Sequence, residues 1–274
     1  MTDAPDLHCT TLNVRRPVPH LRRDHPDAWG NRRGALAAFL DAERPTVLAV
    51  QEAVPTQLDT VSATLGPRWT AVAAARSRAR DAEHVGLFLD AERLRVVDRR
   101  TTALSRRPDR IGSRSWGSLF PRIAVSAVVD DLATGVRFTA IATHLDPFSP
   151  LALRNGARLV GALARGARTP VVAMADWNAS ERSGVARALG AAGLVDTWDL
   201  AEVHDSPAVG TYTNHRSPRP GGARLDRVLV REGDSGGADV RARVRSAAIT
   251  TGPPGGPAFS DHAAVSAVLR WEAV

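Results

Sequence analysis

The stretch RIAVSAVVDDLATGVRFTAIATHL (residues 122–145) decides the fold class. It contains two apolar runs rich in β-branched residues, 122–129 and 136–145, which the short polar segment DDLATG joins. Such runs with turn-forming borders are typical of β-strands, and so short a connection favours antiparallel neighbours. Elsewhere along the chain, strand-like runs alternate with helical patterns, which is typical of an α/β protein. The sequence therefore predicts an α/β fold in which the sheet is mixed.

Further strands, helices and loops follow from the same reasoning. Strands are expected at 7–14, 46–51, 84–89, 170–176, 224–230 and 263–271. Helices are expected at 28–43, 56–65, 149–166 and 181–193, the third of them from a Ser cap and a Pro in its first turn. Loops are expected at 76–83, 99–121, 200–222, 231–242 and 251–257.

The composition of the chain is that of a globular protein. It has 274 residues, of which 43% are apolar and 24% charged, enough for an ample core. The single cysteine, Cys9, excludes an internal disulfide framework. The first residues do not have the pattern of a signal peptide, and no run reaches the roughly 18 to 20 apolar residues of a membrane span. We therefore expect a cytoplasmic protein without stable membrane association, and no feature indicates a partner protein.

The charge of the chain is strongly basic. The net charge is +7, and all 36 basic residues are Arg, without a single Lys. The composition of the genome explains this bias more simply than a functional choice does. Arg nevertheless binds phosphate through two parallel hydrogen bonds, where Lys offers only a point charge. The charge thus favours an anionic partner without identifying it.

Polar side chains stand at the ends of several of the predicted strands. They are Asn13, Glu52, His144, Asp146, Asp176, Asn178, Asp226, Asp261 and His262. Ordinary structural alternatives exist for most of them: Asn13 or Asp176 could form turns, Glu52 could cap a helix, and His144 could be a core histidine. Asp226 is harder to explain in this way, because Asp is depleted within strands. Since all of these residues have equivalent positions, where a rigid scaffold presents functional groups, they are better explained together as one site.

The types of these residues indicate the chemistry. Carboxylate and amide oxygens are hard donors that suit Mg²⁺ or Mn²⁺. The sequence has no cysteine cluster or histidine spacing for zinc, no GxxxxGK[ST] loop and no G-x-S-x-G motif. Two histidines among carboxylates and arginines suit an attack of water on phosphorus. The sequence therefore indicates metal-assisted hydrolysis of a phosphate ester.

The ordered motifs LNV, QE, THL, ADWN, LD and SDH resemble those of the endonuclease/exonuclease/phosphatase superfamily over essentially the whole chain. W-x-x-R (Trp29 to Arg32), GSRSW (112–116) and Phe120-Pro121-Arg122 are similar to motifs of its compact bacterial branch. The resemblance implies a single catalytic domain over residues 1–274. It also implies two mixed, mostly antiparallel β-sheets packed face to face with helices on their outer faces, a four-layer α/β/β/α sandwich. The implied activity is that of a phosphoric ester hydrolase with one or two Mg²⁺ or Mn²⁺ ions.

The resemblance also assigns roles to residues of this sequence. The implied metal ligands are Glu52, Asn13 and Asp261. The implied catalytic residues are His144, Asp176, Asn178, Asp226 and His262. The implied phosphate-binding residue is Arg122, to which we add Arg114 of the loop 99–121, and the supporting residues are Glu83 and Asp146. In this assignment Asp176 and Asn178 position the attacking water, and Asp226 orients His262.

The substrate stays open at this point. The loop 99–121 carries Arg106, Arg107, Arg110 and Arg114, which could follow a nucleic-acid backbone or hold one phosphate group. Aromatic residues for stacking are few, with one Tyr, six Phe and six Trp, and this argues against nucleic acid. The expected substrate is thus a phosphorylated small molecule or a nucleic acid, for a phosphatase or a nuclease. The alternatives are a sphingomyelinase-like phospholipid phosphodiesterase and a non-catalytic binding protein that kept the fold.

Overall fold

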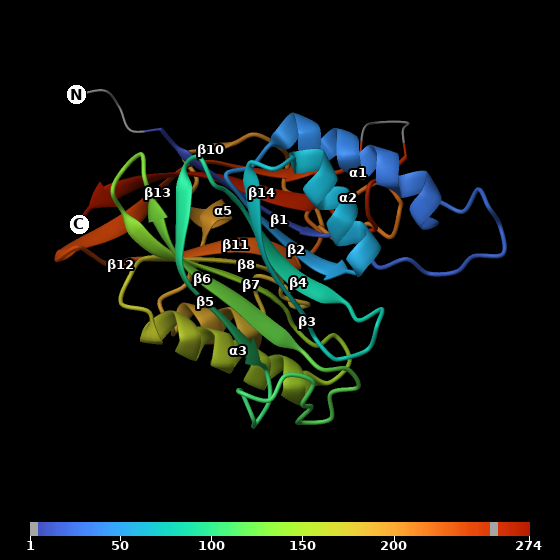
Figure 1. Cartoon of the computed structure of the whole chain (residues 1–274), viewed down its shortest axis with the longest axis horizontal. Coiled ribbons are helices and arrows are strands. Elements are labelled where there is room, and N and C mark those ends of the chain that lie inside the picture. Colours follow the sequence, from blue (N-terminus) through green and yellow to red (C-terminus); the bar gives the residue numbers. More distant parts are fainter. Residues whose placement is uncertain (1–4, 253–256) are drawn as a thin grey trace.

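A computed structural model describes residues 5–252 and 257–274, so residues 253–256 of the loop predicted at 251–257 lie outside the described part. The described strands form two sheets of eight and six strands (Figure 1). Sheet A runs in the order β10 (Val203–His204), β13 (Ala238–Thr250), β14 (Ala264–Ala273), β1 (Leu7–Asn13), β2 (Val47–Ala53), β4 (His84–Asp90), β3 (Trp69–Ala75), and β12 (Gly233–Ser235) pairs with β13. Sheet B runs in the order β5 (Leu94–Ala103), β6 (Ile123–Asp131), β7 (Arg137–His144), β8 (Val171–Asp176), β11 (Asp226–Arg231), β9 (Val195–Asp196).

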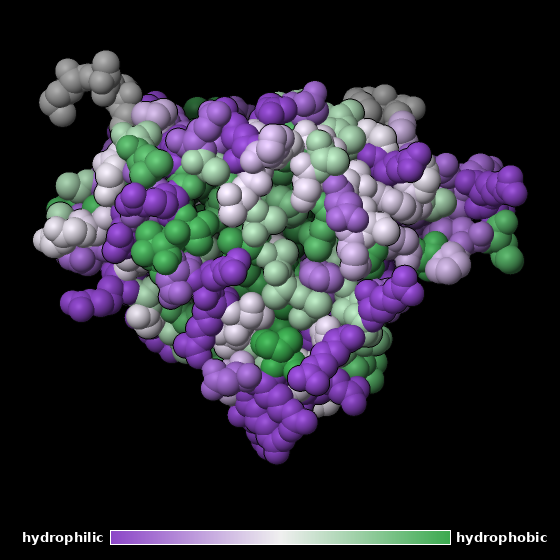
Figure 2. All heavy atoms as spheres, in the orientation of Figure 1, coloured by the Kyte–Doolittle hydropathy of each residue, from purple (hydrophilic) through white to green (hydrophobic). Residues whose placement is uncertain are grey.

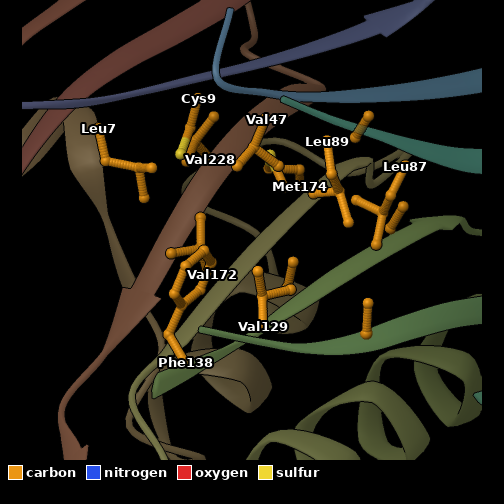
Figure 3. Close-up of a cluster of buried hydrophobic side chains, with 14 of the residues drawn as sticks. Leu7, Cys9, Val47, Leu87, Leu89, Val129, Phe138, Val172, Met174 and Val228 are labelled. Carbon is orange, nitrogen blue, oxygen red and sulfur yellow. The ribbon is translucent and has the colours of Figure 1, made fainter. Parts of the chain in front are cut away.

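The main core lies between the two sheets. Side chains of Leu7 and Val47 from sheet A and of Phe138 and Val172 from sheet B point toward one another in Figure 3 and belong to one buried cluster. In β6 every second residue from Ile123 to Val129 faces this cluster, as the two-residue period of a strand requires. The predicted hairpin of β6 and β7 is therefore confirmed, and it packs one face of sheet B against sheet A.

Helices cover the outer faces of both sheets (Figure 1). They are α1 (Trp29–Glu43), α2 (Pro55–Leu65), α3 (Pro150–Gly166) and α4 (Gly184–Gly190). The short α5 (Thr197–Leu200) instead contacts β13 of sheet A and β11 of sheet B. Leu36 of α1 and Val61 of α2 pack on sheet A, and Val160 of α3 packs on sheet B. This arrangement confirms the predicted four-layer sandwich. In the part of the chain that the structure describes, no helix is both long and apolar enough to span a membrane.

The structure corrects several predicted loops. The loop predicted at 99–121 begins only after Ala103, because β5 continues to that residue, and the segment 231–242 forms β12 and the start of β13. The strand β3 was also not expected. β3 is rich in Ala, and in β5 and β13 Arg and Asp interrupt the β-branched residues; β3 and β5 are edge strands of their sheets. Arginines on a solvent-facing strand surface conceal the alternation from which a strand is predicted.

The direction of the strands brings eight strand ends to one edge of the sandwich. β1 is parallel to β2, and β7 is parallel to β8. Asn13 at the end of β1 lies 3.1 Å from Asp176 at the end of β8, so these four strands finish at the same side. β4, β6, β11 and β14 are antiparallel to their neighbours β2, β7, β8 and β1, so they begin at that side. Residues that end the first four strands therefore lie beside residues that begin or precede the other four.

Candidate active site

A row of three polar residues crosses the edge of sheet B. His144 ends β7, Asp176 ends β8 and Asp226 begins β11, and the strand register places them as direct neighbours in that order. All three are buried. His262, just before β14, completes the row: its Nδ1 lies 2.8 Å from Asp226 Oδ2, and its Nε2 lies 3.8 Å from Asp176 Oδ2. Since His144 Nε2 is 3.4 Å from the same Asp176 oxygen, this carboxylate lies between two imidazoles.

Asn13 and Glu52 extend this row from sheet A. Glu52 has a left-handed backbone with φ of 61° where β2 bulges against β4, and such positions turn a side chain out of the normal alternation. Asn13 donates from Nδ2 to Glu52 Oε1 at 2.9 Å and to Asp176 Oδ2 at 3.1 Å. Its Oδ1 accepts the backbone N–H of Arg15 at 2.9 Å. Asn13, predicted as a metal ligand, is thus placed to position two carboxylates, with its own oxygen already engaged.

Most of the predicted residues line one cavity of about 370 Å³ at this edge. They are Glu52, Glu83, Arg122, His144, Asp176, Asn178, Asp261 and His262. A larger cavity of about 900 Å³ lies toward the other end of β11, at Val230 and Arg231, and contains none of the predicted residues. Several of its charged groups pair with one another, as Arg243 does with Glu202 and Arg241 with Glu272. The smaller cavity therefore carries the candidate site.

Arg122 and Asn178 have distinct positions in this cavity. The Arg122 side chain is buried, and its Nε has no hydrogen-bond partner among the described residues. A buried guanidinium with a free donor is costly unless a ligand accepts from it. Asn178 has a left-handed backbone with φ of 49°, its N–H donates to Asp176 Oδ1 at 2.9 Å, and its Nδ2 donates to Leu145 O at 3.0 Å. It holds the turn that presents Asp176.

The pKa values of Asp176, His262 and His144 are shifted in different directions within the site. Burial, together with Asp226, raises the pKa of Asp176 to about 7. Burial alone would lower the pKa of His262, but Asp226 and Asp176 outweigh it and raise that pKa to about 10. Burial, with Arg122 and His262 adding to it, lowers the pKa of His144 well below its usual range. The cavity thus holds a cationic His262, a neutral His144 and a carboxylate that titrates near neutral pH.

Three arginines of the cavity were not predicted. Arg15, Arg16 and Arg76 all line it. Arg15 Nε lies 3.5 Å from Asp261 Oδ2, and Arg76 Nη1 lies 2.6 Å from Glu83 Oε2. Arg15 and Arg16 follow the LNV motif directly, which is the only signal that could have indicated them, since the chain has arginines throughout.

Three of the predicted site residues contact other groups than the predicted roles require. Glu83 pairs with Arg76 and Arg16, so it holds arginines of the cavity. Asp146 accepts the N–H of Ser149 at 2.7 Å and the hydroxyl of Ser118 at 2.5 Å, and it ties the loop before β6 to the start of α3. The Arg114 guanidinium donates to Leu119 O at 2.9 Å and lines a separate cavity. Asp146 and Arg114 are not among the residues that line the cavity of the candidate site.

The donor set fits a hard divalent cation. Glu52, Asp176 and Asp261 bring three carboxylates to the cavity, and burial raises the pKa of Asp261, with Glu52 adding to the effect. A cation would offset this crowding of negative charge, and oxygen donors suit Mg²⁺ or Mn²⁺. A different trio, Asp176, Asp226 and His262, has possible ligand atoms within 4.8 Å of one another. The 2.8 Å contact between His262 and Asp226 already engages that pair, so Glu52 and Asp261 are better placed to hold a cation.

Comparison with known proteins agrees with this arrangement. The sequence profile of the Endonuclease/Exonuclease/phosphatase family matches residues 10–262. The chain belongs to this family. No curated protein matches the sequence. The family includes phosphatases and nucleases, and its members hydrolyse phosphate esters.

Solved structures of the family have the same fold. An endonuclease/exonuclease/phosphatase from Bacteroides vulgatus is 23% identical over 97% of this chain and 99% of its own, with a TM-score of 0.85. A mannosyl-6-phosphatase from Bacteroides thetaiotaomicron is 23% identical over 96% of this chain and 99% of its own, with a TM-score of 0.81. TDP2 from D. rerio, complexed with a single-strand DNA product, is 15% identical over 97% of this chain and 99% of its own, with a TM-score of 0.69. At these identities the likeness concerns the fold.

Proposed function

We propose that this family member is a Mg²⁺- or Mn²⁺-dependent hydrolase that cleaves a phosphate ester by attack of water. One observation carries the proposal: His262, whose Nδ1 is held by the buried Asp226, faces Asp176 in a cavity that Glu52 and Asp261 also line. Four arginines, Arg15, Arg16, Arg76 and Arg122, line the same cavity. Anionic metal ligands, a titrating carboxylate and positive groups for a phosphate thus meet in one place.

Glu52 and Asp261 would hold the metal. When bound, the metal supplies Lewis-acid chemistry, drawing electron density from a phosphoryl oxygen and lowering the pKa of water. Arg122, whose buried Nε has no hydrogen-bond partner in the described part of the chain, binds a phosphate oxygen. Asn13 keeps Glu52 and Asp176 at a fixed separation through its two hydrogen bonds. This preorganisation lowers the cost of reaching the transition state.

Asp176 and His262 have complementary roles in the reaction. The Asp176 carboxylate lies between the imidazoles of His144 and His262 in the cavity, and there it takes the proton of the attacking water. As the new phosphorus–oxygen bond forms, the ester bond breaks and the leaving oxygen takes a proton from solvent. His262 is cationic up to about pH 10, so its Nε2–H stabilises negative charge on the phosphoryl group. Asp226 fixes the ring through Nδ1.

The similar structures do not distinguish between a phosphate monoester and a phosphate diester as the substrate. One is a mannosyl-6-phosphatase, and another is bound to a single-strand DNA product. Both reactions need the same parts, namely positioned water, a metal and positive groups around phosphorus. We therefore propose a phosphorylated small molecule or a nucleic acid as substrate.

Hydrolysis assays test the proposed function. The purified protein is incubated with p-nitrophenyl phosphate, bis-p-nitrophenyl phosphate and oligonucleotides, with Mg²⁺, Mn²⁺ or EDTA. We expect metal-dependent hydrolysis that Asp176→Asn and His262→Gln reduce by at least about a hundredfold. Asp59→Asn, at an exposed position of α2, changes the same functional group outside the cavity and serves as the control. Hydrolysis that survives EDTA, or the absence of hydrolysis of every substrate, would contradict the proposal.

A further inference from the structure

A second cavity lies in the arginine loop, which we define as residues 104–121 between β5 and β6. It measures about 740 Å³ and is formed by this loop alone. Four arginines line it: Arg106, Arg107, Arg110 and Arg114. No Asp or Glu belongs to the lining. The cavity therefore concentrates positive charge in a concave surface.

The charges of this cavity are not neutralised within the protein. Across residues 5–252 and 257–274, the guanidinium groups of Arg106, Arg107 and Arg110 have no ion pair or hydrogen bond, and that of Arg114 donates to a backbone oxygen. The only acidic residue of the loop, Asp109, pairs with Arg100 of β5 at 2.9 Å. Like charges that share a concave surface repel one another and attract anions. Fold stability therefore gives no reason for this arrangement, whereas anion binding does.

The serines of the loop hold its backbone in one shape. The hydroxyls of Ser105 and Ser113 lie 2.6 Å apart, and Ser105 Oγ accepts the N–H of Arg107 at 2.9 Å. Ser115 Oγ accepts the N–H of Arg106 at 3.0 Å. Gly112, with φ of 87°, provides a left-handed turn that other residues rarely adopt. The GSRSW motif thus builds a preformed cavity, which lowers the entropy lost on binding.

The second cavity adjoins the candidate active site. Ser118 lines the cavity of the loop and Phe120 lines the active-site cavity, so at most about 7.6 Å separates their Cα atoms. The rings of Phe120 and Phe148 lie 6.2 Å apart at this boundary, and 43% and 60% of their surfaces are exposed. In Figure 1 the loop projects at the lower end of the molecule, where Figure 2 shows strongly hydrophilic side chains. A substrate in the active site that extends past Phe120 reaches the arginines.

We propose that the cavity of the arginine loop binds a second phosphate group of the substrate whose first phosphate is hydrolysed in the active site. The inference depends on the proposed function and narrows its substrate class to molecules with two or more phosphate groups. Arg binds phosphate bidentately, and four guanidinium groups in 740 Å³ can surround one phosphate. The second phosphate belongs either to the next unit of a nucleotide strand or to a small molecule with several phosphates.

Binding measurements without turnover test this inference. The dissociation constants of a fluorescein-labelled, 5′-phosphorylated trithymidylate and of fructose 1,6-bisphosphate are measured in EDTA, where the proposed hydrolysis does not occur. In Arg107→Gln/Arg110→Gln we expect the dissociation constant of at least one probe to rise about tenfold or more, since each charge-assisted contact contributes appreciably. The affected probe identifies the source of the second phosphate. For the trithymidylate, the slope of binding against log salt falls by about 1.4, about 0.7 for each lost contact.

A matched variant and a single-phosphate substrate complete the experiment. Arg23→Gln/Arg33→Gln removes two exposed arginines that line neither cavity, and we expect unchanged binding of both probes. With Mn²⁺, hydrolysis of p-nitrophenyl phosphate by the loop variant should stay within about twofold of the wild type, because one phosphate does not reach the loop. Unchanged dissociation constants in the loop variant overturn the inference. If the wild type shows no metal-dependent hydrolysis of any substrate, the proposed function is wrong. The binding measurements are made in EDTA, so their result does not depend on that outcome.

Discussion

Replacing Asp226 by Asn gives a test of how the site keeps His262 charged. Asp226 is fully buried, one of its oxygens lies 2.8 Å from His262 Nδ1, and the other has no hydrogen-bond partner among the described residues. The substitution keeps the shape of the side chain and removes its charge. The pKa of His262 should therefore fall, because Asp226 contributes most to raising it.

The size of the effect follows from the pKa. A rise from 6.5 to about 10 corresponds to about 5 kcal/mol in favour of the imidazolium, at about 1.4 kcal/mol for each pH unit. Asp176 contributes to this rise as well. If Asp226 supplies at least half of it, its removal costs about 3 kcal/mol, which is a factor of about 100 in the proton affinity of the imidazole. At pH 9, where wild-type His262 still holds its proton, only about a tenth of the variant imidazole is protonated, so kcat of Asp226→Asn should fall about tenfold.

The pH dependence separates this explanation from a general loss of structure. We expect the ratio of wild-type to variant kcat to shrink to within about twofold at pH 6, because the variant imidazole also takes up a proton there. The assay is hydrolysis of bis-p-nitrophenyl phosphate or p-nitrophenyl phosphate with Mn²⁺ from pH 6 to 9, beside the melting temperature of both proteins. A ratio that stays constant over this range would refute the reasoning, and so would a variant as active as the wild type at pH 9.

Three further predictions concern stability and the metal. Arg32→Lys should lower the free energy of unfolding by about 3 kcal/mol in a urea titration, because the buried guanidinium donates to four backbone carbonyls that an ammonium cannot all reach; an unchanged midpoint would contradict this. Asn13→Ala should weaken Mn²⁺ binding in calorimetry about tenfold or more, since Glu52 and Asp176 lose the amide that fixes them, and equal affinity would show that Asn13 does not position them. In EDTA the raised pKa of His262 stabilises the folded state fully below about pH 6.5, and this contribution is lost as the pH rises through about 10. The melting temperature of the wild type should therefore exceed that of His262→Gln most at pH 6 and least at pH 10, and the opposite trend would be decisive against it.

Much of the fold could be predicted because its inner strands are apolar and β-branched. The hairpin of β6 and β7 and the inner strands β1, β2, β8 and β14 were expected close to where they lie. The strands β3, β5 and β13 were not, since Ala dominates β3 and exposed arginines interrupt the β-branched residues of β5 and β13. Tertiary pairing to an inner strand compensates for that weak local preference.

The sequence by itself determined which residue types the candidate site contains, because metal binding and acid–base chemistry need carboxylates, amides and histidines, and these stand in order at the strand ends. Only the tertiary structure decided how they act together. It directs the oxygen of Asn13 to the backbone of Arg15, and it brings Arg15 and Arg76 into the active-site cavity and Arg114 into another. The physical reason is that the register between strands far apart in the chain, together with the bulge at Glu52, sets the direction of each side chain. Local sequence carries the chemistry of a residue, whereas its neighbours are determined by pairings up to hundreds of residues away, such as that of β1 with β14.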